Sequence, residues 1–146
     1  MERTIKAVVN LAIKSEEQAY TFYNSAYKET KIKSAKILFK KLFEEEKKHK
    51  QRLLKIKKDP KNIVFKKTRL NHIRIAKSLI MTPLNEIYEL RKIFMIAIKK
   101  EEQAFKMYKK MANNIKTKTI KNILVELAKQ EAKHKALLVK TEKKCF

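Results

Sequence analysis

Residues 16–19 read EEQA, and residues 101–104 read EEQA again, 85 positions later in the chain. A second motif, a glutamate followed three residues later by a histidine, keeps the same offset. It occurs in EEEKKH at residues 44–49 and in KQEAKH at residues 129–134. A repeat of two motifs at one spacing predicts an internal duplication of a helical hairpin, with pseudo-twofold symmetry between the copies.

Apolar residues at helical spacing surround these motifs and predict four long helices. We expect them at about residues 4–28, 34–58, 83–112 and 119–140. Asp59-Pro60 should end the second helix, and Thr82-Pro83 should begin the third with a cap followed by proline. Residues 59–82 would then form a long crossover, with a short helix around residues 70–80. Such a connection suits two helices that are not antiparallel neighbours.

Composition supports an all-α fold and a single domain over residues 1–146. The chain contains no glycine and only two prolines, which removes most of the residues that tight β-turns need. Its length fits one domain with one core. The expected architecture is a four-helix bundle made of two repeated hairpins.

Charged and polar residues interrupt the apolar stripes of all four predicted helices. Glu16, for example, falls on the stripe that includes Val9, Ile13 and Tyr23, whereas its neighbour Glu17 lies about 100° away and can reach solvent. A glutamate and a histidine three residues apart share one helix face. The residues predicted to converge in the core are Glu16, Glu46, His49, Glu101, Glu131 and His134.

Four buried carboxylates without positive partners would cost far more than a domain's net stability of about 5 to 15 kcal/mol. Two divalent ions would neutralise them, and each histidine would give one ion a nitrogen ligand. Mixed oxygen and nitrogen donors suit iron or manganese, in the arrangement of ferritin-like di-iron bundles. The structural alternative is a buried salt-bridge network to lysines. It is disfavoured because no lysine falls on the predicted stripes.

For three other residues the sequence predicts less specific roles. Tyr23 and Tyr108 repeat at the same offset, two turns beyond Glu16 and Glu101. They either hydrogen-bond ligand carboxylates of a neighbouring helix, as a second shell, or simply pack. His72, in the crossover, has no glutamate three residues before it and is expected to be a surface or packing residue.

These motifs resemble the rubrerythrin branch of the ferritin-like superfamily. The segment AIKSEEQAYTFY at residues 12–23 is similar to that family's first-helix signature, and EEEKKH and KQEAKH resemble its ligand helices. The resemblance implies two iron ions, bound by the six residues above as metal-ligating and catalytic groups. It implies reduction of hydrogen peroxide or dioxygen, often within a homodimer.

Two departures from the family bear on its chemistry. Rubrerythrins usually carry a rubredoxin-like domain with four cysteines, whereas this sequence has only Cys145. Electrons would therefore come from a separate donor, such as a rubredoxin-like protein. The family's third helix often carries a second carboxylate three residues after the first ligand, where this chain has Ala104. Without it, the repeat favours two nearly equivalent metal positions.

Two other functions compete with peroxide or dioxygen reduction. The same six ligands would serve a ferritin-type protein that oxidises and handles iron. The formal net charge of +23 also fits a basic nucleic-acid-binding protein with a structural metal. A lysine-coated, solvated surface is the more ordinary explanation of this charge, and it would bring only non-specific attraction to polyanions. The start of the sequence lacks a signal-peptide pattern, and its apolar runs are too short for a membrane span, so we expect a cytoplasmic protein.

Overall fold

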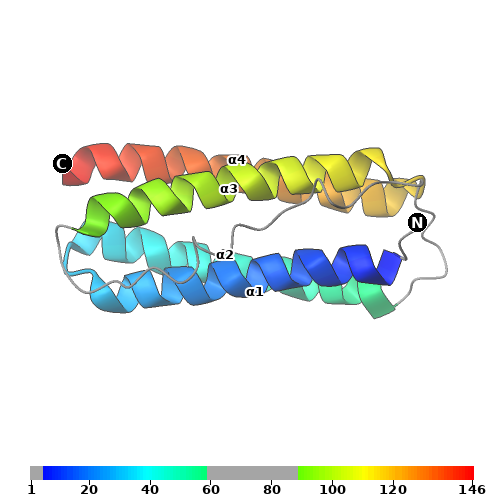
Figure 1. Cartoon of the computed structure of the whole chain (residues 1–146), viewed down its shortest axis with the longest axis horizontal. Helices are drawn as coiled ribbons and strands as arrows, with labels where there is room; N and C mark the ends of the chain where they lie inside the picture. Colours follow the sequence, from blue (N-terminus) through cyan, green and yellow to red (C-terminus); the bar gives the residue numbers. More distant parts are fainter. Residues whose placement is uncertain (1–4, 59–88) are drawn as a thin grey trace.

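The computed structural model describes residues 5–58 and 89–146, which form four α-helices (Figure 1). These helices are α1 (Ile5–Glu29), α2 (Lys33–Lys58), α3 (Leu90–Asn113) and α4 (Lys118–Cys145). The predicted all-α, ferritin-like four-helix architecture is confirmed. The crossover, its expected short helix, Thr82-Pro83 and His72 lie outside the described residues.

The predicted boundaries agree closely for α1 and α2, but the expected end of the fourth helix at residue 140 is wrong. The helix α4 continues to Cys145. Residues 140–144 contain no glycine or proline that would stop a helix. The Phe146 N–H still donates to the Glu142 carbonyl at 3.2 Å, and the Phe146 ring lies edge-on to Phe94 of α3. The last turn is therefore held against the bundle.

The helices pack as two antiparallel hairpins, α1 with α2 and α3 with α4 (Figure 1). Short turns at residues 30–32 and 114–117 join the members of each hairpin. The hairpins meet through further contacts of α2 with α4 and of α1 with α3. Because α2 ends at one end of the bundle and α3 begins at the other, these two helices run in the same direction. This is the relation that the predicted crossover requires.

Two apolar clusters fill the interior, one towards each end of the bundle. Val9, Leu53, Met111 and Leu124 belong to one, and Phe22, Leu42, Phe94 and Leu138 to the other. In every helix the ligand candidates fall in sequence between the members of the two clusters. The packing thus encloses a polar layer halfway along the bundle, with apolar side chains on both sides.

No helix in the described part of the chain is long and apolar enough to cross a membrane.

Candidate metal centre

The polar layer contains all six residues that the sequence predicts as ligands. His49 is 5% exposed, and the other five are 1% or 2% exposed. Each helix contributes to the layer: Glu16 from α1, Glu46 and His49 from α2, Glu101 from α3, and Glu131 and His134 from α4. Side chains this polar are seldom so deeply buried unless hydrogen bonds, opposite charges or a metal ion offset the cost of removing them from water.

The two histidines turn the same ring nitrogen, Nδ1, towards the carboxylates. Nδ1 of His49 lies 3.0 Å from Glu131 Oε1, 3.1 Å from Glu46 Oε1 and 3.5 Å from Glu16 Oε2. Nδ1 of His134 lies 3.3 Å from Glu46 Oε1, 3.6 Å from Glu101 Oε1 and 3.8 Å from Glu131 Oε1. The rings stack with centroids 5.6 Å apart.

These contacts divide the layer into two overlapping groups of four donors. One group is Glu16, Glu46, His49 and Glu131, and the other is Glu46, Glu101, Glu131 and His134; the donor atoms within each lie within 4.8 Å of one another. Glu46 and Glu131 belong to both groups, so their carboxylates can bridge two ions. Glu16 and Glu101 each belong to one.

In each of the six side chains, one buried oxygen or nitrogen atom that could bind a metal has no hydrogen-bond partner among the described residues. The atoms are Glu16 Oε2, Glu46 Oε1, His49 Nδ1, Glu101 Oε2, Glu131 Oε1 and His134 Nδ1. Several are within ion-pair distance of one another, yet they do not meet hydrogen-bond geometry. Oxygen and nitrogen lone pairs aimed at a shared centre are what a pair of divalent ions such as iron or manganese requires. The residues therefore fit a two-metal site.

The tyrosines connect the two hairpins at this layer. The Tyr23 hydroxyl of α1 donates to Glu101 Oε1 on α3, and the Tyr108 hydroxyl of α3 donates to Glu16 Oε1 on α1. Burial and the neighbouring carboxylates raise the pKa of both tyrosines, so both keep their protons and remain donors. Of the two roles left open by the sequence, the hydrogen-bonding one is realised.

The pKa values of several side chains in the polar layer are raised, so these groups keep protons that they would lose in water. Burial, reinforced by the charge of Glu46, raises the pKa of Glu16 to about 8. Burial and the other carboxylates likewise raise the pKa of Glu131. Burial alone would lower the pKa of His49, but its carboxylate neighbours Glu16 and Glu46 outweigh burial and raise this pKa to about 9. Without metal, protonated carboxylic acids and imidazolium groups thus reduce the net negative charge of the layer.

Comparison with known protein families gives a match to rubrerythrin over residues 7–93 and 92–146, nearly the whole chain. The chain belongs to the rubrerythrin family. A search of curated proteins and a search of solved structures each gave no match. The buried glutamate and histidine cluster is the di-metal carboxylate site of this family.

A buried lysine beside this rubrerythrin-family site corrects one sequence argument. The apolar stripes predict no inward-facing lysine, yet Lys100 is only 7% exposed. It continues the line of Ile93 and Ile96 along the flank of α3, and burial lowers its pKa. The residue 85 positions earlier is Ser15, which is also buried. Lys100 gives little support to a buried salt-bridge network in place of a metal site, because it forms no ion pair within 4 Å in the described part of the chain.

Sequence reasoning also missed Glu45, the residue immediately before a predicted ligand. Its Oε2 lies 3.0 Å from His134 Nε2, the ring nitrogen that faces away from the other carboxylates. This hydrogen bond lowers the pKa of Glu45, which therefore remains a carboxylate. The only signal in the sequence was its place in the run EEEKKH, one step around the helix from Glu46.

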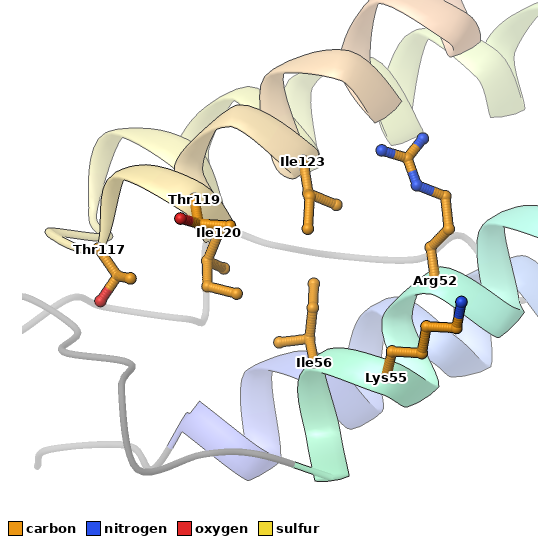
Figure 2. A pocket seen from close by; sticks show the side chains of 7 residues that line it. All are labelled: Arg52, Lys55, Ile56, Thr117, Thr119, Ile120 and Ile123. Carbon is orange, nitrogen blue, oxygen red and sulfur yellow. The ribbon is translucent and has the colours of Figure 1, made fainter.

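Two of the hollows in the surface of this rubrerythrin-family bundle are lined by residues of α2. A cavity of about 410 Å³ reaches Glu16 and Glu46 from between α1 and α2. Another, of about 430 Å³, lies where the end of α2 meets the start of α4, and its side chains Ile56 and Ile123 point toward each other (Figure 2). No glutamate or histidine lines the second hollow, so of these two hollows in the described part of the chain only the first reaches predicted ligands.

Proposed function

We propose that this chain is a di-iron oxidoreductase of rubrerythrin type, which reduces hydrogen peroxide or dioxygen with electrons from a separate donor protein. The observation that carries the proposal is the set of six side chains from four helices, each of which directs an unpaired donor atom into the same layer. Membership of the rubrerythrin family supports iron as the metal. Within these 146 residues a single cysteine cannot form the four-thiolate centre of a rubredoxin-like domain.

When bound, a pair of ferrous ions supplies the two electrons that cleave the O–O bond of peroxide; with two protons, two water molecules result. Glu46 and Glu131 would help to hold both ions, and Glu16 and Glu101 would each help to hold one. His49 and His134 contribute neutral nitrogen donors through Nδ1. Mixed carboxylate and imidazole ligation of this kind is suited to iron.

The surrounding residues of the chain would orient these ligands and control access. Tyr23 and Tyr108 each fix one oxygen of a terminal carboxylate, which leaves the second oxygen directed inward. The apolar clusters above and below the layer limit entry of water from the bundle ends. Peroxide is small enough to reach Glu16 and Glu46 through the cavity between α1 and α2.

The test is anaerobic loading with Fe(II), followed by one equivalent of hydrogen peroxide. We expect two iron ions per chain, the absorption of an oxo-bridged diferric centre, and repeated turnover when a reductant is supplied. Glu131→Ala, which removes a donor shared by both groups, should abolish all three results, whereas the exposed Glu126→Ala should not. Iron binding without peroxide-dependent oxidation would contradict the proposal.

The cavity also supports a second candidate, a ferritin-type protein that oxidises and releases iron. The carboxylates Glu16 and Glu46 line it and could receive a cation from solvent, although Lys47 and Lys50 line it too and Lys50 pairs with Glu17. The two functions differ in what they consume. A reductase turns over repeatedly with a fixed iron content, whereas an iron-oxidising protein needs new Fe(II) in proportion to each oxidation.

A further inference from the structure

The two predicted histidine ligands occupy repeat-related positions but differ in their outer contacts. His134 Nε2 lies 3.0 Å from Glu45 Oε2. A carboxylate only accepts hydrogen bonds, so Nε2 carries the proton and donates it. In the neutral ring, this contact leaves Nδ1 of His134 unprotonated and directed at the other donors, as metal ligation requires.

His49 lacks the corresponding contact. The residue 85 positions after Glu45 is Gln130, which would be its partner if the repeat were perfect. Gln130 Nε2 instead donates to Glu126 Oε1 at 3.1 Å, one turn earlier in α4. Within residues 5–58 and 89–146, no side chain hydrogen-bonds Nε2 of His49. The ring of His49 is therefore oriented by fewer groups than that of His134.

The His49 and His134 groups also differ in their access to solvent. The cavity between α1 and α2 reaches Glu16, which belongs only to the His49 group, and the shared Glu46. Its lining includes neither Glu101 nor His134. An ion pair between Lys50 Nζ and Glu17 Oε1, 3.1 Å apart, lies at this cavity. Of the two carboxylates that belong to a single group, Glu16 therefore faces this opening and Glu101 does not.

We propose that the two metal positions are unequal, with a tightly held ion beside His134 and a weaker, exchangeable ion beside His49. Glu45 is the positioning residue that creates the difference. The inference rests on the proposed two-metal function and adds an order of loading and release to it. Outer hydrogen-bond partners of ligand histidines typically change metal affinity about 10- to 100-fold, which sets the expected difference.

The first experiment is an anaerobic titration of the full chain with Co(II), followed through its visible absorption. We expect two binding steps whose dissociation constants differ by about 10- to 100-fold. A chelator should then remove one ion quickly and the second slowly. Two ions that bind with equal affinity and leave together would overturn the inference while leaving the proposed function intact. Binding of fewer than two ions would contradict both.

Two variants assign the steps to positions. Glu45→Ala should weaken the tighter step about 10- to 100-fold and leave the other step within about twofold, whereas Glu45→Gln, which keeps an accepting oxygen, should recover part of the loss. Gln130→Glu should strengthen the weaker step, because repulsion from Glu126 turns the new carboxylate away from its present partner. The inference is wrong if Glu45→Ala weakens both steps equally, or if neither Glu45→Gln nor Gln130→Glu shifts the ratio of the two constants.

Discussion

The Tyr23 hydroxyl on α1 donates a hydrogen bond to the Glu101 carboxylate on α3. The repeat-related bond runs in the opposite direction, from Tyr108 on α3 to Glu16 on α1. The two hairpins are therefore connected by a reciprocal pair of bonds through the polar layer. Each bond holds a carboxylate of the opposite hairpin.

Removing either hydroxyl should destabilise the bundle by a similar amount. Tyr23→Phe and Tyr108→Phe keep the ring packing but leave a buried carboxylate oxygen without its donor, which costs about 1 to 3 kcal/mol. Chemical denaturation of the metal-free protein measures the loss. Tyr20→Phe is the control, because this partly buried tyrosine forms no side-chain hydrogen bond in the described residues. Equal stability of all three variants would show that the tyrosines only pack.

The metal-free protein should lose stability as the pH rises from about 6.5 to 8. The pKa of Glu16 is about 8 in the folded state against an ordinary value of 4.5, and that of His49 is about 9 against 6.5. Over this range the folded state binds more protons than the unfolded chain, so the free energy of unfolding falls with pH. A full difference of one bound proton changes the free energy of unfolding by about 1 kcal/mol per pH unit.

Bound metal should stabilise the protein more as the pH rises. The ligand side chains must release their protons to bind metal, so metal binding strengthens with increasing pH. We therefore expect the difference in Tm between metal-loaded and chelated protein to be smallest near pH 6 and to widen by pH 8. Glu16→Gln, which has no proton to lose, should flatten the pH dependence of the metal-free form. A chelated protein whose Tm rises between pH 6.5 and 8 would contradict the assignment.

Metal stoichiometry can test which glutamates point into the core and bind metal. Glu46→Ala and Glu131→Ala each remove a donor common to both groups, so the metal content should fall below two ions per chain. Glu17→Ala and Glu102→Ala should retain two, because these neighbours are about half exposed and form ion pairs with Lys50 and Lys135. Elemental analysis after gel filtration measures the ratio. A site emptied by Glu17→Ala but not by Glu16→Ala would show that the assignment is reversed.

The six core residues could be predicted from sequence because each interrupts an apolar stripe, and the 85-residue repeat supports each assignment a second time. A buried glutamate among leucines is visible in the pattern of a helix without knowledge of its neighbours. The all-α fold and the paired hairpins followed from the same periodicity. The homodimer, the electron donor and the cytoplasmic location stay predictions.

The contacts beside the stripes could not be predicted in this way. Lys100 and Glu45 each lie about 100° from a ligand glutamate, and whether such a position is covered depends on how closely the next helix approaches. Helical periodicity placed Tyr23 on the inner face but could not identify Glu101, 78 residues away, as its acceptor. The pairing of residues across hairpins is a property of packing. The sequence-based expectation of nearly equivalent metal positions stays a prediction, and the contact of Glu45 with only one histidine is the observation from which we propose unequal affinities.

The last prediction concerns Ala104, which lies partly buried one turn beyond Glu101 on α3. Family members that carry a carboxylate at this place can exchange it with a histidine when the iron changes oxidation state, so that one metal moves. Alanine offers no oxygen, and its repeat partner is the buried Ala19. We therefore expect His49 and His134 each to keep its own metal position in both oxidation states, even though the two affinities differ.

Crystal structures of the reduced and oxidised protein test the first part of this prediction, since neither metal should shift by more than about 1 Å when both histidines stay bound. Ala104→Glu tests the second part. It introduces an exchangeable oxygen donor near Glu101 and should raise the rate of peroxide turnover, while Ala19→Glu, on the repeat-related turn of α1, serves as the matched variant. A large metal shift in the unmodified protein, or a turnover rate that Ala104→Glu leaves unchanged, would mean that the alanine does not set the mechanism.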